Sequence, residues 1–293
     1  MSMINGHARW AFDFMSWKPN LNDLKIAVSL IQSEEKQRLS KFMFQEDFKA
    51  SLSGRLLMRH YVRQAMSIDN HQFKLHRDTR EKPYLKEIDG ETNWDNKVLD
   101  FNVSHQGSFA CLAGYANVKR KTNEHVKLGV DVMKIEYTGG KSIAEFFRLM
   151  TRNFSNDEWI HIKSFNSNVG KLEAFMRNWC LKESYVKNIG TGITVDLSKL
   201  NFIIETDLKP NEVVTDTKLK VEGQLLDNFT FEESLIGNEH CVAVSLKNQP
   251  ADEHHEPFAF ELIKFEELIK NATPLTPVDE NYCREILAKD TKS

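Results

Sequence analysis

Two different periods of apolar and polar residues occur in the first half of the chain. Apolar residues recur three and four positions apart at 52–61, which predicts an amphipathic helix. Strict alternation follows at 101–113, on both sides of a turn at 106–107, and predicts a β-hairpin. Asn102 and Ser104 then share one face of its first strand, because successive side chains of a strand point to opposite faces.

The second half begins with a predicted strand at 128–135. A long helix is predicted at 172–189, where Gly190 ends it. Between them, two capping boxes each predict the start of a helix, Ser142 with Glu145 and Ser155 with Glu158. Four β-like runs follow the long helix and suggest an antiparallel sheet, at 193–205, 217–224, 229–235 and 240–247.

A polar segment without apolar periodicity at 119–127 divides the chain. We therefore predict an N-terminal subdomain at 1–126 and a C-terminal subdomain at 127–293, which ends in an acidic tail from Gln249. A chain of 293 residues is long enough for two modest cores. The basic stretch 119–125 is interpreted as a surface insertion or simply a solvated loop.

Charge differs between the two halves. Residues 1–126 hold 19 Lys and Arg against 15 Asp and Glu, and residues 127–293 hold 20 against 27. A basic first half suits an anionic small ligand. An acidic second half argues against a nucleic-acid partner.

Targeting and redox signals are absent from the sequence. No apolar run reaches the roughly 18 residues of a membrane-spanning helix, and the start lacks a secretory pattern, so we expect a cytosolic protein without a membrane partner. The four cysteines form no C-x-x-C pair, which predicts reduced, buried thiols. His254 and His255 lie in the acidic tail, where a solvated loop is a better explanation than a metal site.

Three charged residues stand where the pattern predicts buried ones. Glu183 continues the apolar stripe of the helix at 172–189, and Lys187 lies one turn further on; an i,i+4 ion pair worth about 0.3–0.5 kcal/mol is the ordinary explanation. Asp131 occupies the strand at 128–135, where the ordinary explanation is an edge or strand-end residue facing water.

A different explanation accounts for these residues together. Asp131 and Glu183, from one strand and one helix, are the isolated carboxylates that Mg²⁺ prefers, since this ion keeps coordination sites for water and phosphate. Gly129 beside them leaves space for a backbone or a ligand. Lys187 could neutralise a phosphate or protonate a leaving oxygen. We therefore predict a magnesium site that acts on a pyrophosphate.

Two motifs carry these residues, G-V-D at 129–131 and W-C-L-K-E-S-Y-V-K at 179–187. Together they resemble the paired signature of the phosphopantetheinyl transferases of the Sfp type. The stretches 9–12, 101–107 and 175–184 are similar to the cytosolic eukaryotic type, and the resemblance covers about 8–280. It implies an α+β fold of two similar subdomains related by a pseudo-twofold axis, each a small antiparallel sheet packed on helices.

The resemblance also implies a reaction and its partners. The 4′-phosphopantetheine arm of coenzyme A would be joined to a serine of an apo carrier-protein domain, with release of adenosine 3′,5′-bisphosphate and with Mg²⁺ bound at the pyrophosphate. Fatty-acid synthase, an aminoadipate-reducing enzyme and other carriers are all consistent with the family. Two subdomains in one chain would make a monomer sufficient.

Site residues follow from the resemblance position by position. Asp131 and Glu183 match the metal ligands, Glu183 or a bound water would take the serine proton, and Lys187 matches the lysine that meets the leaving phosphate. The coenzyme A contacts are matched by fourteen positions, three of which are shared with the metal or catalytic residues: Arg38, Arg77, Asp78, Thr79, Arg80, Glu81, Lys82, Asn102, Val103, Ser104, His105, Asp131, Glu183 and Lys187.

One position departs from many relatives, which carry a second acidic residue where this chain has Met133. Water or Gln106 would then complete the metal coordination. Two rival functions remain open: another magnesium-dependent enzyme that hydrolyses a nucleotide pyrophosphate, and a coenzyme A-binding protein without catalysis.

Overall fold

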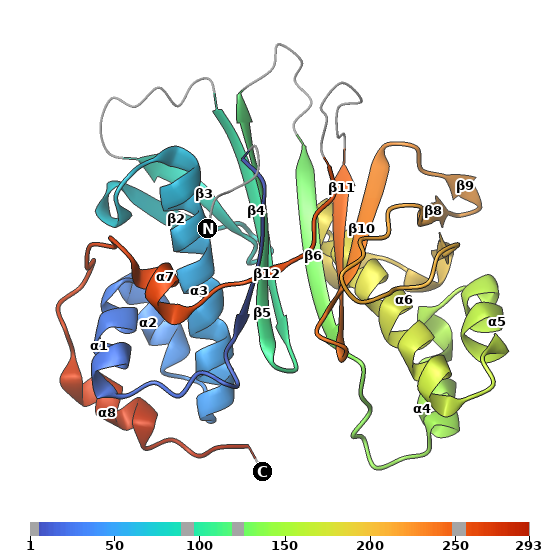
Figure 1. Cartoon of the computed structure of the whole chain (residues 1–293), viewed down its shortest axis with the longest axis horizontal. Coiled ribbons are helices and arrows are strands. Elements are labelled where there is room, and N and C mark those ends of the chain that lie inside the picture. The colour runs from blue at the N-terminus through green and yellow to red at the C-terminus, as the bar shows by residue number, and fades with distance from the viewer. Residues whose placement is uncertain (1–5, 89–96, 119–125, 248–255, 293) are drawn as a thin grey trace. The chain divides into compact units, whose positions relative to one another are not determined.

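The computed structural model describes residues 6–88, 97–118, 126–247 and 256–292. The chain divides into two compact units, one formed by Met1–Asn123 with Glu261–Ser293 and the other by Glu124–Phe260. Each unit contains small antiparallel sheets packed on helices, so the predicted α+β class is confirmed (Figure 1). The basic stretch 119–125 and the pair His254-His255 lie outside the described residues.

A four-stranded sheet forms the centre of the first unit. Its order is β12 (Glu261–Leu262), β1 (Ala8–Asp13), β5 (Phe109–Val118) and β4 (Lys97–Gln106). The pairs β1–β5 and β5–β4 are antiparallel, and the pair β1–β12 is parallel. The predicted hairpin at 101–113 is confirmed as β4 and β5, with Gly107 in the turn at φ 62°.

Helices cover one face of this sheet (Figure 1). The long helix α3 (Gln45–Met66) packs on β4 and β5, and it contains the apolar positions predicted at 52–61. Gly114 of β5 admits the ring of Tyr61, because a Cβ at this position would lie 2.4 Å from Tyr61 Cζ. The remaining elements of the unit are α1 (Leu21–Ser29), α2 (Ser33–Leu39), β2 (Phe73–Arg77), β3 (Pro83–Ile88), α7 (Phe265–Ile269), α8 (Glu280–Leu287) and a 3₁₀ turn at Asn70–Gln72.

From Glu261 onward the C-terminal tail belongs to the first unit, whereas the prediction assigned the whole tail to the second subdomain. β12 adds to the edge of the first sheet beside β1. Ile263, Phe265 and Leu268 join the apolar core of that unit, as do Cys283 and Ile286 of α8. These residues follow the second unit in sequence, but they pack on the first. Burial of their apolar side chains stabilises this packing, because apolar area removed from water contributes about 25 cal/mol per Å².

The second unit contains two three-stranded sheets rather than one. One has the order β10 (Phe229–Ile236), β11 (His240–Lys247) and β6 (Lys127–Lys134). The other has the order β7 (Leu200–Ile203), β8 (Lys218–Val221) and β9 (Gln224–Leu225). The predicted strand at 193–205 is wrong in its first part, where 3₁₀ turns occupy Gly192–Thr194 and Leu197–Lys199.

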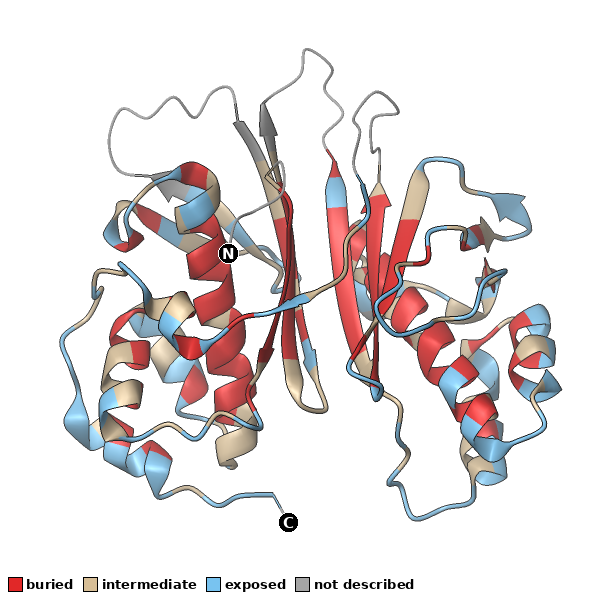
Figure 2. Cartoon of the chain, viewed as in Figure 1, coloured by how far each residue is buried: buried red, intermediate tan, exposed pale blue. Residues whose placement is uncertain are grey.

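Helix α6 (Asn168–Ile189) packs along β6 and β11. Like α3 it has 22 residues, and Figure 2 shows its buried side in red. Gly190 ends it in the left-handed conformation at φ 65°, as predicted. Both predicted capping boxes are present, at the starts of α4 (Ile143–Leu149) and α5 (Asn156–Ser164), and a 3₁₀ turn at Thr151–Asn153 separates these helices.

Two further expectations concern the chain as a whole. Among the helices that the structure describes, none combines the length and the apolar composition needed to span a bilayer. All four cysteines are buried free thiols, as predicted: Cys111, Cys180, Cys241 and Cys283.

Candidate functional site

Asp131 lies on the face of β6 that packs against α6. It is paired with Ala243 of β11 and is only 5% exposed. β6 is at the edge of its sheet, but the interpretation of Asp131 as an edge residue facing water is wrong, because α6 covers it. Met133 shares this face and contacts the apolar cluster of the unit, so its side chain belongs to the core.

Gly129 is what lets α6 approach β6 so closely. A Cβ at this position would lie 2.2 Å from the carbonyl oxygen of Ser184 and 2.5 Å from the backbone nitrogen of Asn188. Asn188 fixes the contact, since its side-chain amide donates to the carbonyls of Lys127 at 3.0 Å and Ser245 at 2.8 Å. The predicted role of Gly129 in a close approach is therefore confirmed, and the approaching group is a helix backbone.

Lys187 binds Asp131 across this contact, with Nζ 2.6 Å from Oδ1. Glu183 lies one turn earlier on α6 and is half-buried. Its pKa is raised, first by burial and then by the negative charge of Asp131, while Lys187 acts in the opposite direction. The ion pair of Lys187 is therefore with Asp131 of the strand rather than the expected i,i+4 partner, and its charge also acts on Glu183.

This donor set suits a hard divalent cation. The charge of Asp131 disfavours ionisation of Glu183, and a cation bound by both carboxylates would offset this repulsion. Mg²⁺ is commonly held by one or two carboxylates, with water and phosphate oxygens at its other positions. No group of three or more His, Cys, Asp and Glu that could hold a metal occurs in the part of the chain that the structure describes.

The predicted coenzyme A contacts on β4 alternate between its two faces. Asn102 and Ser104 share one face and are 5% and 6% exposed. Val103 lies on the other face and packs against the apolar core of the unit, so its side chain is part of the core. His105 is exposed and Gln106 is half-exposed at the end of the strand.

The charged stretch at 77–82 precedes Pro83, which disfavours a helix, and predicts an exposed basic loop; in the structure this stretch is the turn of the β2–β3 hairpin. Asp78 organises it: its Oδ1 accepts from the backbone nitrogens of Arg80 at 2.8 Å and Lys82 at 2.9 Å. Residues 78–81 are exposed, as predicted. Lys82 Nζ lies 3.5 Å from Asp100 Oδ1, so the loop is held beside β4, two residues before Asn102.

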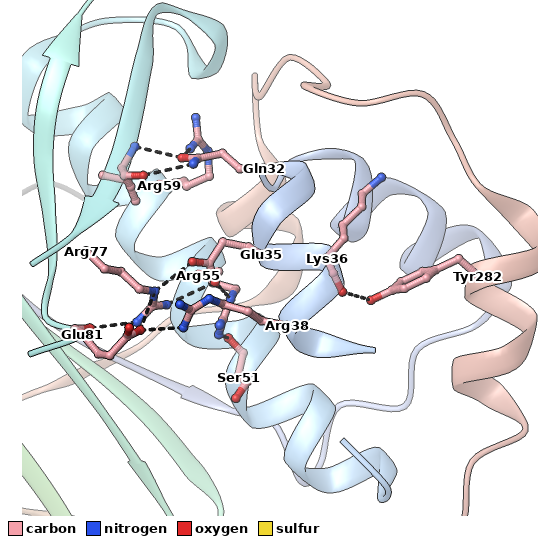
Figure 3. A network of polar contacts seen from close by, with 11 residues as sticks. Gln32, Glu35, Lys36, Arg38, Ser51, Arg55, Arg59, Arg77, Glu81 and Tyr282 are labelled. Atoms are coloured by element: carbon pink, nitrogen blue, oxygen red, sulfur yellow. Dashed lines mark hydrogen bonds and ion pairs between the residues drawn. The ribbon is translucent and has the colours of Figure 1, made fainter. Parts of the chain in front are cut away.

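Carboxylates hold two of the three arginines that were predicted to contact coenzyme A, Arg38 and Arg77 (Figure 3). Arg38 of α2 donates to Glu81 at 2.6 Å. Arg77 donates to Glu35 at 3.0 and 3.1 Å through Nε and Nη2, and Arg55 of α3 binds the same carboxylate. Burial raises the pKa of Glu35, but Arg77 and Arg55 outweigh this, so that the net pKa is lowered.

The partners of several charged residues that shape these sites carried no recognisable signal in the sequence. Glu35 and Arg55 are distant in sequence from the loop that they support. On the hidden side of α6, Lys182 forms a fully buried ion pair with Glu158 at 2.8 Å. Arg177 forms a bidentate pair with Glu233 at 2.7 and 2.9 Å. Two of these residues stood out in the sequence for local reasons, Glu158 in a capping box and Glu35 in the first turn of a helix, but neither pattern predicted the ion pairs.

Two family models match most of the chain. Residues 15–117 match the family model described as 4′-phosphopantetheinyl transferase, N-terminal. Residues 127–245, which include Asp131, Glu183 and Lys187, match the 4′-phosphopantetheinyl transferase superfamily. The chain belongs to this superfamily, and its activity is that of a phosphopantetheinyl transferase.

Similar curated proteins extend along nearly the whole chain. The L-aminoadipate-semialdehyde dehydrogenase-phosphopantetheinyl transferase of Xenopus laevis is 36% identical over 95% of this chain and 91% of its own length. The human protein of the same name is 35% identical over 94% and 89%. A phosphopantetheinyl transferase of Thraustochytrium is 32% identical over 83% and 79%.

Proposed function

We propose that this protein transfers the 4′-phosphopantetheine arm of coenzyme A to a serine of an apo carrier-protein domain. The serine oxygen forms a bond to the phosphorus of the arm, the bond from that phosphorus to the bridging oxygen breaks, and adenosine 3′,5′-bisphosphate leaves. The observation that carries the proposal is the contact of Lys187 with Asp131, beside Glu183, within the region that matches the superfamily.

Glu183 is proposed as the group that takes the serine proton, directly or through a bound water. Burial and the charge of Asp131 raise its pKa, which brings a carboxylate closer to the range in which a general base is effective. Lys187 is proposed to stabilise the negative charge that develops on the leaving phosphate. Its ion pair with Asp131 restrains the ammonium group in place before the substrate arrives.

Asp131 and Glu183 are proposed to hold Mg²⁺, with Gln106 or a water as a further ligand. When bound, the ion would supply positive charge to the pyrophosphate. Calorimetric titration of the protein alone with Mn²⁺ or Mg²⁺ tests the ligand set without any turnover. Asp131→Asn and Glu183→Gln should each abolish the binding isotherm, whereas Gln106→Ala should weaken it only if the amide is a ligand.

The coenzyme A contacts are proposed to come from the first unit, from Arg38, the loop 77–82 and residues 102–105. Guanidinium groups bind phosphate with paired hydrogen bonds, which supports a phosphate site at Arg38 and Arg77. The Asp78 side chain accepts hydrogen bonds from the backbone nitrogens of Arg80 and Lys82, so Asp78 is assigned a positioning role in the loop. His105, exposed at the end of β4, is proposed to contact the 3′-phosphate together with the basic side chains.

The acceptor is proposed to be a carrier domain of an aminoadipate-reducing enzyme, of fatty-acid synthase, or of both. The names of the Xenopus laevis and human relatives support the first choice. Incubation with a panel of apo carrier domains and mass measurement of each product would identify the acceptors. A monomer in the cytosol is proposed as the working state, which light scattering after size exclusion and cell fractionation can test.

One experiment separates this function from its two rivals. Protein, Mg²⁺ and coenzyme A are incubated with and without an apo carrier, and adenosine 3′,5′-bisphosphate is measured. Transfer predicts release only when the carrier is present, with an equal amount of modified carrier. Release without a carrier would indicate a hydrolase. Coenzyme A binding without release under either condition would indicate a binding protein.

A further inference from the structure

The turn of the β2–β3 hairpin contains a glutamate where this type of turn favours glycine. Glu81 N donates to the carbonyl of Asp78 at 3.0 Å, and Glu81 then adopts φ 65°. A turn followed by one left-handed residue is a common hairpin connection, in which glycine avoids the steric cost of a Cβ. Non-glycine residues in this region persist where surrounding contacts compensate for the strain.

Both arginines proposed as phosphate contacts touch Glu81 (Figure 3). Its carboxylate accepts from Arg38 Nη1 at 2.6 Å and lies 4.0 Å from Arg77 Nε. Its backbone carbonyl accepts from Arg77 Nη1 at 2.9 Å. Glu81 therefore places a negative charge at the guanidinium groups that an incoming phosphate would use.

The two carboxylates of this cluster differ in how firmly they are held. Glu35 is 18% exposed in its side chain and binds Arg55 and Arg77 together, which makes it a fixed part of the unit. Glu81 and Arg38 are 62% and 46% exposed, and an ion pair this open to water contributes little and separates readily. Arg38 can therefore exchange Glu81 for another anion while Arg77 remains anchored on Glu35.

We propose that Glu81 is an internal counter-ion of the phosphate site, which the 3′-phosphate of coenzyme A displaces from Arg38, and that it thereby limits the affinity for that phosphate. This inference rests on the proposed function, which assigns Arg38 and the loop to coenzyme A. A phosphate monoester carries about 1.5–2 negative charges at neutral pH and several acceptor oxygens, so it outcompetes a single carboxylate for the guanidinium. The released Glu81 stays near the bound phosphate and repels it.

The proposal predicts that removal of one negative charge tightens binding. Coenzyme A and dephospho-coenzyme A, which lacks the 3′-phosphate, are titrated into wild-type protein, Glu81→Gln and Glu81→Gly by calorimetry. Glu81→Gln should bind coenzyme A about 3- to 10-fold more tightly and leave the affinity for dephospho-coenzyme A unchanged. Glu81→Gly should bind coenzyme A as tightly and also melt at a higher temperature, because it relieves the left-handed strain.

A matched control is available on the same helix and the same hairpin. Glu34 of α2 pairs with Lys74 of β2 at 2.8 Å, and its side chain is 59% exposed. Glu34→Gln removes the same charge from the same unit but leaves Arg38 and Arg77 with their partners, so its affinity for coenzyme A should equal that of wild type. In an Arg38→Ala background, the gain from Glu81→Gln should disappear.

The outcomes separate this inference from the function on which it rests. If wild type binds neither ligand, both the function and the inference fail. If wild type prefers coenzyme A to dephospho-coenzyme A but Glu81→Gln binds coenzyme A no more tightly, the function stands and the inference is overturned. Weaker binding by Glu81→Gln would assign Glu81 to positioning of Arg38. The inference would also be overturned if Glu81→Gln raised the affinity for both ligands equally, or if Glu34→Gln raised the affinity for coenzyme A as much as Glu81→Gln does. Either result would show that the affinity depends on the net charge of the unit rather than on the contact of Glu81 with Arg38.

Discussion

Lys187 and Asp131 form an ion pair of 2.6 Å that joins the last turns of α6 to the centre of β6. The pair places a cation at the one buried carboxylate of that strand and next to Glu183 on the same helix. Because Gly129 lets the helix backbone lie close to the strand, the Lys187 side chain of α6 can reach Asp131 of β6.

Replacement of the catalytic candidates should abolish transfer without unfolding the protein. Glu183→Gln and Lys187→Met should each lower the rate of carrier modification by about 100-fold or more, as expected for loss of a general base or of a charge-stabilising group. Glu173→Gln provides the control, since this glutamate is exposed on the same helix. Equal rates in Glu183→Gln and Glu173→Gln would remove Glu183 from the reaction.

Gly129→Ala should lower the free energy of unfolding by about 1–3 kcal/mol, because the new Cβ meets backbone atoms of Ser184 and Asn188 that cannot move independently. The matched control is Gly54→Ala in α3, where a Cβ would meet only Val103 Cγ2 at 3.9 Å. That change should stabilise by about 0.5–1 kcal/mol, since alanine is favoured over glycine within a helix. Urea denaturation measures both; a destabilised Gly54→Ala with an unchanged Gly129→Ala would contradict the structure.

The ion pair between Lys182 and Glu158 should behave as a buried pair. Burial raises the pKa of Glu158 and lowers that of Lys182 despite their attraction, so loss of hydration outweighs the pairing. Lys182→Met leaves Glu158 buried without its cation and should cost about 3–5 kcal/mol of unfolding free energy. The double variant Lys182→Met/Glu158→Gln should recover at least about half of that loss in a double-mutant cycle. A double variant as unstable as the sum of the singles would show that the two residues act separately.

His60 should make stability depend on pH between its unfolded and folded pKa values. Burial first, and then the charge of Arg63, lower its pKa from 6.5 to about 4. The unfolded chain therefore binds a proton in this interval that the folded chain does not, so stability is lost as pH falls below about 6.5. Between pH 7.5 and pH 5 wild type should lose about 2 kcal/mol more unfolding free energy than His60→Gln.

Exposed His71 serves as the control for this measurement, because His71→Gln should retain the pH dependence of wild type. Urea denaturation at the two pH values gives the comparison. An identical pH dependence in wild type and His60→Gln would show that His60 is not held in its neutral form by burial.

Much of the local structure could be predicted because its signals lie within a few residues of one another. The capping boxes at Ser142 and Ser155 and the stop at Gly190 each depend on one helical turn. Apolar–polar alternation similarly predicted the β4–β5 hairpin and the orientation of Asp131 opposite Val130 and Val132. The strand predicted at 193–205 failed in its first part because apolar residues there are equally compatible with short 3₁₀ turns.

The partners of charged side chains could not be predicted in the same way. Lys187 had an obvious neighbour at Glu183 on its own helix, yet it binds Asp131, which is 56 residues away in sequence. Arg77 and Arg55 meet on Glu35 from a strand and a separate helix. The sequence offers several carboxylates as possible partners for each long basic side chain. The packing of the helices and strands decides which carboxylate lies close enough to form the ion pair.

The sequence by itself determined the class of fold, the order of most elements and the candidate residues for the chemistry, because periodicity, capping and motif spacing depend on residues that are close together in the chain. Only the tertiary structure decided that the tail from Glu261 packs on the first unit. It also decided that a helix backbone, rather than a ligand, lies against Gly129, and that Glu81 forms an ion pair with Arg38. These outcomes depend on apolar burial and charge pairing between segments far apart in the chain, and their free energies are set by distances that arise only when the segments pack together.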